Sequence, residues 1–290
     1  MIFSIIIPTF QNHEYLSLCV KSILKNSSYK HEIIIHLNGI DEKTKKFILE
    51  NRLDFSESEE NIGLCSGVNL AAKKATTNYI LYAHDDMYFL PGWDRHICDE
   101  ISKIKHNKFY LSLTQLSHTG PVKGNIQHIQ FDCGKTLDNF DEKKLLSNFK
   151  DLKFYDLQGT HWAPHLIHKE LWDKIGGFSE EFNPGFASDP DLNMKLWNEG
   201  VRIFKSISKS RVYHFGSLTT RKNIKIRRNN GKNTFLIKWG ISVDLFIKHY
   251  LQRGSIYKSP LIEPKKNIFF YYDLLASKFK LLKVKFFNER

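Results

Sequence analysis

Short apolar runs alternate with helix-like repeats through the first 116 residues of the chain. Continuous apolar runs predict strands at 2–8, 33–37 and 79–83, with further strands at 53–56 and 109–116. Between them, apolar residues recur every three or four positions and predict helices at 16–24, 42–51, 64–75 and 93–104. Strands that are apolar throughout are typical of parallel sheets covered by helices. We therefore expect an α/β fold of Rossmann type, with a mainly parallel sheet flanked by helices.

The pattern weakens after Leu116. Residues 117–156 show poor periodicity, and we interpret them as an insertion or a long loop over a ligand site. Beyond them the sequence predicts a strand at 162–167, helices at 169–175 and 189–199, and short strands at 201–204 and 211–214. Residues 1–220 are thus expected to form one domain with halves at 1–116 and 117–220.

The remaining residues, 221–290, differ from this domain and predict a basic, partly helical extension. Six apolar residues fall on one helical stripe, namely Ile268, Tyr272, Leu275, Phe279, Leu282 and Phe286. Lys280 and Lys283 lie off the stripe, which indicates a basic amphipathic helix. Such a helix suits an anionic membrane surface, and it equally suits packing on the domain or at a homodimer interface.

The overall composition narrows the class of protein. A formal charge of +12 attracts phosphate on nucleotides, nucleic acids or anionic lipids. No stretch approaches the roughly 20 apolar residues of a membrane-spanning helix, and no signal peptide is evident, so we expect a cytoplasmic protein that is soluble or peripheral to a membrane. The four scattered cysteines indicate neither a disulfide framework nor a thiolate zinc site.

The candidate chemistry begins with Asp85 and Asp86, which directly follow a buried strand. Ligands bind beyond the carboxyl ends of strands in such sheets, so Thr9, Asn38 and the acidic pair are expected to line one crevice. Carboxylate oxygens there can hold Mn²⁺ or Mg²⁺ against a diphosphate, whose negative charge grows as it departs. The alternative is a solvated turn that ends the strand.

A second acidic cluster, Asp189-Pro190-Asp191, opens a predicted helix. Residues two apart point roughly 200° away from each other around a helix, so only one carboxylate faces the crevice, where it can act as a general base. The alternative is a helix cap, because Asp is favoured at the cap and Pro in the first turn.

Three further residues are candidates with equally ordinary structural explanations. His214 ends a predicted strand and can complete a metal shell or serve as a hydrogen-bonded structural residue. His161 and Trp162 can contact an acceptor sugar, because aromatic rings suit the apolar faces of sugars, but Trp162 also suits the core.

Together these segments resemble the family 2 inverting glycosyltransferases of GT-A fold. The resemblance covers roughly residues 1–217. It is carried by 4–9, 33–39, Asn61-Ile62-Gly63 with Asn69, His84-Asp85-Asp86, 176–180, 188–192 and His214. Three positions depart from the family pattern, because Asn38 and Ser188 stand where the family often has Asp and Glu, and His84 replaces an acidic residue.

The resemblance implies transfer of a sugar from a nucleoside diphosphate to a glycan or lipid-linked acceptor, in surface polysaccharide or lipopolysaccharide synthesis. Residues 1–116 would bind the nucleotide sugar and 117–220 the acceptor. Asp86 and His214 would hold Mn²⁺ or Mg²⁺, and Asp189 would be the base, with Asp191 as the alternative. The nucleotide-sugar contacts would be Pro8, Thr9, Phe10, Asn38, Asn61, Gly63, Asn69 and Asp85.

Two rival functions remain open at this point. A nucleotidyltransferase also uses an α/β sheet and acidic metal ligands, but it usually has a Gly-rich, Lys- or Arg-containing loop where this chain has Thr9 to Asn12. A nucleic-acid-binding protein fits the charge and the basic stretch at 221–228, but it leaves both acidic clusters unexplained. We therefore expect no specific nucleic-acid partner.

Overall fold

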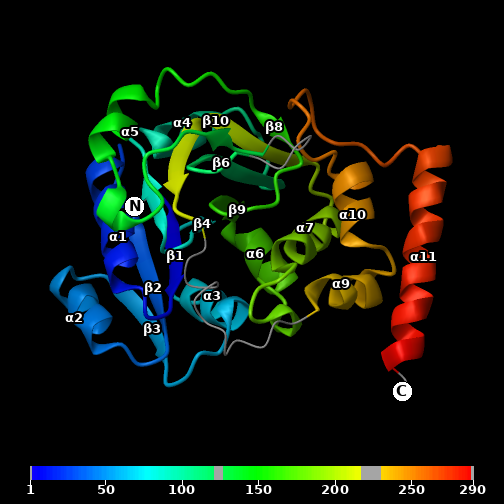
Figure 1. Ribbon diagram of the computed structural model, residues 1–290, viewed down its shortest axis with the longest axis horizontal. Coiled ribbons are helices and arrows are strands. Elements are labelled where there is room, and N and C mark those ends of the chain that lie inside the picture. Colours follow the sequence, from blue (N-terminus) through cyan, green and yellow to red (C-terminus); the bar gives the residue numbers. More distant parts are fainter. Residues whose placement is uncertain (1, 121–126, 217–229, 289–290) are drawn as a thin grey trace.

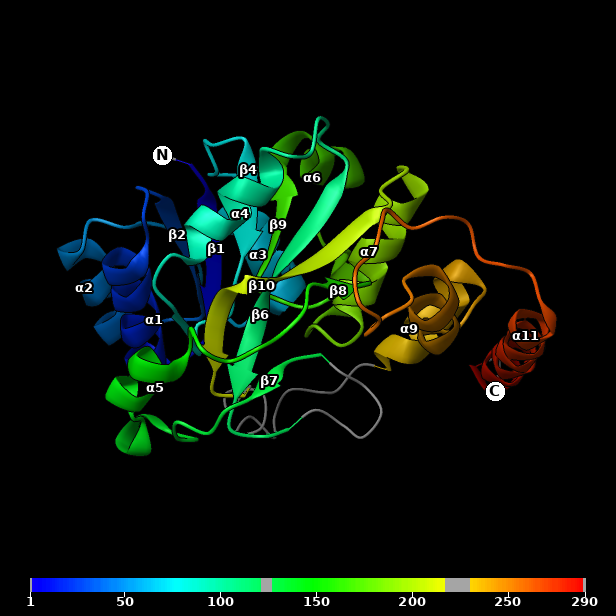
Figure 2. The same cartoon turned by 90° about the horizontal axis from the view of Figure 1, so that it is seen from above.

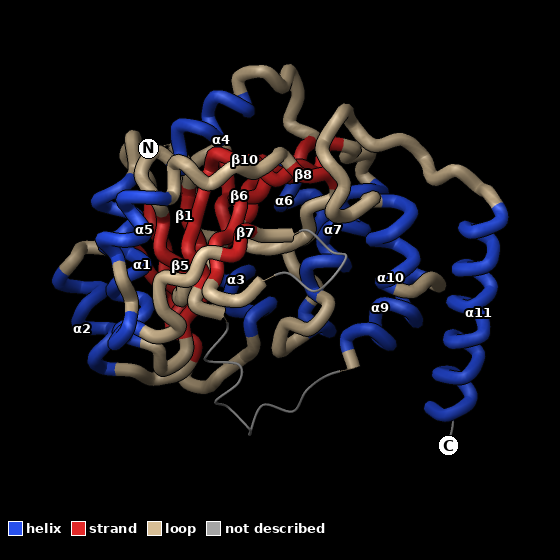
Figure 3. The backbone as a smooth tube through the Cα atoms, turned by 45° about the horizontal axis from the view of Figure 1, so that its top comes forward, coloured by secondary structure: helices blue, strands red, loops and turns tan. Residues whose placement is uncertain are grey.

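The computed structural model describes residues 2–120, 127–216 and 230–288. Within them, ten strands form one mixed sheet with the order β3-β2-β1-β4-β9-β6-β10-β5, while β7 pairs with β6 and β8 with β10 (Figures 1 and 3). The strands are β1 (Ser4–Thr9), β2 (Glu32–Asn38), β3 (Asp54–Ser58), β4 (Tyr79–Tyr82), β5 (Met87–Phe89), β6 (Phe109–Ser117), β7 (Ile129–Gln130), β8 (Leu157–Gln158), β9 (His165–His168) and β10 (Ile203–His214).

The helices of the domain cover both faces of this sheet. They are α1 (His13–Asn26), α2 (Glu42–Glu50), α3 (Leu64–Ala72), α4 (Trp93–Ile101), α5 (Glu142–Asn148), α6 (Lys169–Ile175) and α7 (Ser188–Asn198), with short 3-10 turns η1 (Leu137–Asn139) and η2 (Glu180–Phe182). The chain moves outward from β1 through β2 to β3 and then returns to β4. Because such crossovers are right-handed, α1 and α2 lie on one face and α3 on the other.

The predicted fold class is confirmed, and several elements match closely. Parallel pairing joins β1 to both β2 and β4, as continuous apolar runs predict. The strand predicted at 162–167 is wrong in its extent, because β9 begins only at His165, after Pro164, which lacks the N–H that a central strand needs. β9 lies antiparallel between β4 and β6.

The two short strands predicted at 201–204 and 211–214 are also wrong, because they are one strand, β10. The register of β10 on β6 shifts between Ile207 and Arg211, so the intervening Ser-Lys-Ser forms an irregularity rather than an end. Asp156 accepts a hydrogen bond from the backbone N–H of Ser208, and Ser210 donates to the carbonyl of Trp93. These polar contacts explain why the apolar pattern is interrupted inside the strand.

Residues 117–156 are more ordered than a long loop where the structure describes them. They contain β7, η1 and α5, and Leu145 and Phe149 pack with Tyr88 and Tyr213 in a small apolar cluster beside the main core. The Tyr88 hydroxyl donates to Glu142 at 2.5 Å, which ties α5 to β5. This segment therefore covers the α1 and β5 side of the sheet.

The C-terminal extension is helical and packs beside α7 and η2 of the domain (Figures 1 and 2). It consists of α9 (Gly231–Trp239), α10 (Val243–Leu245), the π-helix η3 (Phe246–Tyr250) and α11 (Ile268–Asn288). Helix α9 contacts η2, η3 contacts α7, and α11 contacts α9 and α10. Among the described residues, no helix combines the length and the apolarity needed to cross a bilayer. All four cysteines are free.

Candidate active site

The carboxyl ends of β1, β2 and β4 bring the predicted polar residues to one edge of the sheet. Thr9 ends β1, Asn38 ends β2, and His84-Asp85-Asp86 follow β4. The Thr9 hydroxyl donates a hydrogen bond of 2.7 Å to Oδ2 of Asp85, so residues 76 positions apart meet directly. Parallel pairing of β1 with its two neighbours produces this contact.

Asp85 is held in an environment that resists ionisation. Burial raises the pKa of Asp85 to about 7, and the neighbouring Asp86 charge adds to the rise, while hydrogen bonds from Thr9 and Asn12 oppose it. A buried carboxyl pair of this kind gains stability when a cation binds nearby.

Three side chains at this edge have the geometry of a divalent metal site. Ligand atoms of His84, Asp86 and His214 all lie within 4.8 Å of one another. Asp86 Oδ1 lies 3.2 Å from His214 Nε2 and 4.0 Å from His84 Nδ1. Donor atoms that share one ion at about 2.1 Å lie roughly 3 to 4 Å apart, and both distances from Asp86 fit that range. The residue that sequence reasoning missed as a ligand is His84.

Gln115 on β6 fixes the orientation of the His214 ring. The Gln115 amide nitrogen donates to the carbonyl of Ala163, which leaves its Oε1 as the acceptor facing His214 Nδ1 at 3.2 Å. His214 Nδ1–H therefore donates to Gln115, and Nε2 faces Asp86, where it can carry a proton or bind a cation. Metal-binding histidines commonly have such a partner on the second ring nitrogen. No motif in the sequence indicated Gln115.

The protonation tendencies of the two histidines suit the same role. Burial lowers the pKa of His84 to about 4, with a further contribution from His214, so the imidazole is neutral at pH 7. Burial also lowers the pKa of His214, but the Asp86 carboxylate outweighs it and the net shift is upward. The charge that favours a proton on His214 equally favours a metal cation beside it.

Asp189 has the properties of a general base. Helix α7 begins at Ser188 after Ala187 at a φ of 63°, so Asp189 lies inside the first turn and does not cap the helix, contrary to the alternative interpretation. Its Oδ1 is buried and has no hydrogen-bond partner among the described residues. Burial raises the pKa of Asp189 to about 7. A base with a pKa near the working pH is best suited to proton transfer.

Tyr82 lies close to both the Asp189 carboxylate and the Asp85-Asp86 pair. Burial raises the pKa of the Tyr82 hydroxyl well above its usual range, and the charges of Asp189, Asp85 and Asp86 add to the rise. Tyr82 ends β4, just before the metal-site residues. Asp189 and the acidic pair therefore both lie within electrostatic reach of one buried phenol.

Both carboxylate oxygens of Asp191, the alternative base, already have hydrogen-bond or ion-pair partners. Ser179 donates to its Oδ2 at 2.6 Å, while Trp239 Nε1 and Lys238 Nζ reach its Oδ1 at 2.8 and 3.0 Å. Its side chain is completely buried. Two of these three partners come from α9, so the C-terminal extension supports the helix that carries Asp189.

The predicted nucleotide contacts form a connected loop structure at the same edge. Asn38 accepts a hydrogen bond from the N–H of Ile62 and donates to the carbonyl of Gly63, whose own N–H donates to Asn61. Gly63 has a φ of 88°, and a Cβ there would lie 2.4 Å from the Asn183 side chain, so only glycine fits. Pro8 lies within β1.

Three other predicted site residues have defined neighbours in the structure. The ring of Phe10 lies against Gly39, where an added Cβ would be 3.3 Å away. His161 lies 3.3 Å from the guanidinium of Arg253, and its ring contacts Trp162, whose buried Nε1 has no hydrogen-bond partner among the described residues. Asn193 of α7 donates to the carbonyl of Thr160, which places this pair next to the Asp189 helix.

Comparison with known proteins identifies the family. Residues 4–171, more than half of the chain, match the model described as glycosyl transferase family 2. The chain belongs to this family. An uncharacterized glycosyltransferase of Rickettsia prowazekii is 25% identical over 232 residues, which cover 76% of this chain and 67% of the relative. A Rickettsia typhi glycosyltransferase matches over the same shares at the same identity.

Solved structures show that the transferase has the GT-A fold. S. aureus TarS, residues 1–349, superposes with a TM-score of 0.55 at 18% identity and covers 74% of this chain. GalNAc-T7 with UDP, GalNAc and Mn²⁺ gives a TM-score of 0.55 at 16% identity over 80% of the chain. The transferase matches only 60% of the TarS chain and 45% of the GalNAc-T7 chain.

Family membership confirms the predicted glycosyltransferase rather than a nucleotidyltransferase. The β1–α1 connection, Phe10-Gln11-Asn12, contains no glycine or basic residue for a triphosphate. The basic stretch at 221–228, on which the nucleic-acid alternative depended, lies outside the described residues.

Asn69, predicted to contact the nucleotide sugar, uses both ends of its amide on the backbone of Phe178, at 2.9 and 2.8 Å. We expect Asn69→Ala to lower the free energy of unfolding by about 1 to 3 kcal/mol, because both backbone groups lose a partner. Denaturant titration measures this, with exposed Asn78→Ala as the control. Unchanged stability combined with weaker nucleotide binding would instead place Asn69 in the nucleotide site.

Proposed function

We propose that this transferase moves a sugar from a nucleoside diphosphate to a hydroxyl of a glycan or lipid-linked acceptor, with inversion at the anomeric carbon. The observation that carries the proposal is Asp189, whose carboxylate has one buried, unpartnered oxygen and whose pKa is raised by burial to about 7. The acceptor oxygen forms the new bond to the anomeric carbon, its proton passes to Asp189, and the bond to the diphosphate breaks on the opposite face.

His84, Asp86 and His214 would hold a divalent cation. A bound cation neutralises the charge that grows on a departing diphosphate. Two imidazole nitrogens and one carboxylate oxygen favour Mn²⁺ over Mg²⁺, because Mg²⁺ prefers oxygen ligands. Mn²⁺ in the GalNAc-T7 structure supports this choice.

A uridine diphosphate sugar is the donor class that the structural neighbours suggest. TarS has been solved with UDP-GlcNAc, with a TM-score of 0.53 to this chain at 17% identity. Thr9, Asn38 and Gly63 would surround the base and ribose, as the family resemblance implies. His161 and Trp162 would contact the acceptor, for which the unpartnered Trp162 Nε1 supplies a donor.

The pH dependence of transfer should report the ionisation of Asp189. Because burial raises its pKa to about 7, the carboxylate is protonated and inactive below that pH. We expect kcat/KM to fall about tenfold per pH unit below 7 and to level off above it. Above pH 7, Asp189→Asn should lower the rate by about 10²-fold or more and should remove this pH dependence, while donor binding persists.

The pKa of Asp85 is also about 7, so a second variant is needed to show which carboxyl titrates in the pH profile. Thr9→Val makes this distinction. The Thr9 hydroxyl lowers the pKa of Asp85, so its loss raises the midpoint of the profile only if Asp85 is the titrating group. An unchanged midpoint supports Asp189. A midpoint that moves upward in Thr9→Val contradicts the assignment.

Metal affinity should depend on the residue that orients His214. Gln115→Leu removes the acceptor for Nδ1–H, and we expect it to weaken Mn²⁺ binding by about 10- to 100-fold. Electron paramagnetic resonance of free Mn²⁺, titrated in the presence of UDP, measures this without turnover. His84→Ala should weaken binding similarly, whereas exposed His106→Ala should not. Wild-type affinity in both Gln115→Leu and His84→Ala would refute the three-residue site.

We further propose that α11 holds the transferase at the cytoplasmic face of an anionic membrane, where a lipid-linked precursor of surface polysaccharide or lipopolysaccharide would be available. The supporting feature is the apolar face of α11, whose side chains are 50 to 77% exposed. It consists of Ile268, Phe269, Tyr271, Tyr272, Leu275, Phe279, Leu282 and Phe286. The opposite side, with Phe270 and Ser277, packs on the protein.

Charge favours lipid over a second copy of the chain. At about 100° per residue, Lys278 and Lys285 flank one side of the apolar face and Lys280 and Lys283 the other. The one acidic residue of the helix, Asp273, already pairs with Lys248 and His249. Two such faces brought together would oppose like charges, whereas each lysine near an anionic leaflet contributes about 1 kcal/mol.

Vesicle flotation tests this arrangement. We expect binding to vesicles that contain phosphatidylglycerol and not to pure phosphatidylcholine, with loss of binding in Phe279→Asp and Leu282→Asp. Leu49→Asp, the same change at a leucine that is 58% exposed on α2, serves as the matched control. Absence of flotation, together with a wild-type dimer that Leu282→Asp dissociates, would make this face a homodimer interface instead.

A further inference from the structure

Asn183 joins the segment proposed to contact the nucleotide to the segment that carries the base. Its Oδ1 accepts a hydrogen bond of 2.9 Å from the backbone N–H of Cys65, and its Nδ2 donates to Oγ of Ser66 at 2.8 Å. Both partners lie in the first turn of α3, directly after Gly63. The first N–H groups of a helix have no partner within it, so Asn183 caps α3 from 118 positions away along the chain.

The turn between Asn183 and Asp189 is short and bonded to itself. The hydroxyl of Ser188 donates to the carbonyl of Gly185 at 2.7 Å, and the backbone N–H of Ser188 bonds to the same carbonyl at 3.3 Å. Ala187 has a φ of 63°, a conformation that a non-glycine residue keeps only where its surroundings hold it. The position of Asn183 therefore determines where α7 begins.

The start of α3 also lies directly beside this turn. Burial raises the pKa of the Cys65 thiol to about 12, the charge of Asp189 adds to the rise, and the Ser188 hydroxyl opposes it. A Cβ on Gly185 would lie 3.4 Å from the Cβ of Leu64. Residues next to the nucleotide segment are therefore within electrostatic reach of the base.

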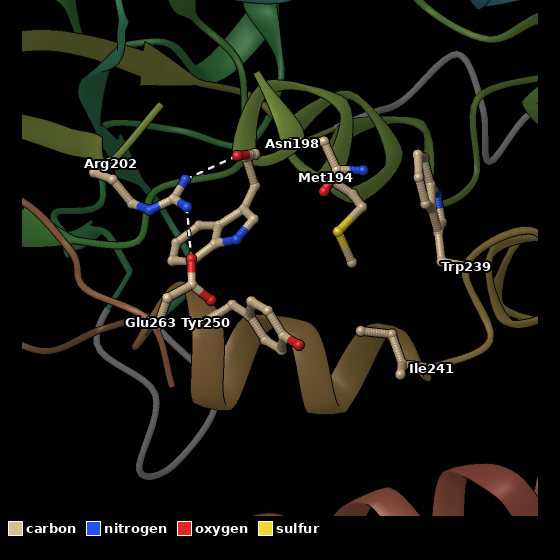
Figure 4. A pocket seen from close by; sticks show the side chains of 8 residues that line it. Met194, Asn198, Arg202, Trp239, Ile241, Tyr250 and Glu263 are labelled. Atoms are coloured by element: carbon tan, nitrogen blue, oxygen red, sulfur yellow. Dashed lines mark hydrogen bonds and ion pairs between the residues drawn. The ribbon is translucent and has the colours of Figure 1, made fainter. Parts of the chain in front are cut away.

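Other contacts hold the two partners of Asn183 from elsewhere. Segment 61–63 has its own support, because Asn38 bonds to backbone groups within it. Helix α7 is held by α9 on the face that carries Asp191, and Figure 4 shows the pocket that Trp239 and α7 line there. Residues two apart point roughly 200° away from each other around a helix, so this support lies on the side of α7 away from the base. Asn183 holds the start of α7 from the nucleotide side.

From these contacts we infer that Asn183 is a positioning residue that fixes Asp189 relative to the nucleotide contacts at 61–63. The inference rests on the proposed function, which makes Asp189 the base. A displacement of about 1 Å in a catalytic group costs on the order of 10²-fold in rate, because the reacting groups lose their alignment. Loss of the Asn183 amide should therefore slow the chemical step more than it weakens nucleotide binding.

Hydrolysis of UDP sugars tests the inference on the full chain, with water in place of the acceptor and Asp189 as the group that takes its proton. UDP-glucose, UDP-galactose, UDP-GlcNAc and UDP-GalNAc with Mn²⁺, at about pH 8 where the base is ionised, give kcat, and titration with UDP gives Kd. We expect Asn183→Ala to lower kcat by about tenfold or more and to change the Kd of UDP by less than about threefold. Asn183→Asp should recover most of the wild-type kcat, because a carboxylate accepts from both the Cys65 N–H and the Ser66 hydroxyl.

Asn51→Ala is the matched control, because it removes an amide that bonds to the carbonyl of Phe47 at 2.8 Å at the end of α2, and it should change neither constant. Asn183→Ser, with a shorter side chain, takes the place of Asn183→Ala if that variant does not fold. An unchanged kcat, with or without lower stability, overturns the inference and leaves Asn183 as a helix cap only. A Kd that rises as far as kcat falls, or an equal loss of kcat in Asn183→Asp, also overturns it.

The result is separable from that of the proposed function. Donor hydrolysis that is lost in Asp189→Asn but unchanged in Asn183→Ala supports the proposed base and refutes the positioning role. Hydrolysis that persists in Asp189→Asn, or the absence of hydrolysis with every donor of the panel, counts against the proposed function, and the inference about Asn183 fails with it.

Discussion

Parallel pairing of β1 with β2 on one side and β4 on the other is the constraint on which the site depends. The register places Ser4 beside Glu32 and Ile80, so the three strands end near one another. The Thr9 to Asp85 hydrogen bond then closes across this edge. Thr9 and Asn38 end buried strands and the Asp85-Asp86 pair follows one, so the packing of the core decides where these groups meet.

The same packing buries carboxyl groups of the site without enough positive charge or hydrogen bonds to stabilise their ionised forms. Asp85 and Asp189 are desolvated enough that the pKa of each rises to about 7. For such carboxyls the ionised form destabilises the folded protein, so their contribution to stability grows as the pH falls below 7 and is lost as the pH rises through it. A ligand that brings positive charge or hydrogen bonds to them reverses this loss. Binding and folding are therefore linked at this edge.

Much of the fold followed from local pattern. Helix α6 matches the predicted 169–175, because a helix-like repeat ends at a glycine pair, and β2 matches because three consecutive isoleucines, 33–35, favour a buried strand. β10 did not, because its polar interruption is satisfied by residues distant in sequence, Trp93 and Asp156. Local periodicity contains no information about such partners.

The candidate site shows the same division between local and distant information. The placement of Asp86 close to His214 agrees with the order of the motifs, but no local pattern distinguishes the surroundings of Asp189 from those of Asp191. Those surroundings differ because Trp239 and Lys238, which come from a segment with no recognisable motif, bind Asp191. The sequence likewise gave no indication of Gln115, because its role depends on which of its amide atoms faces His214.

The bond between Trp239 and Asp191 also has a consequence for how the molecule is assembled during translation. Asp191 is synthesised 48 residues before the indole that binds it. Until α9 has emerged from the ribosome and docked, α7 carries a carboxylate that lacks two of its three donors. A nascent chain that already contains the whole family-matching region, 4–171, therefore still needs α9 before the surroundings of α7 reach their final form.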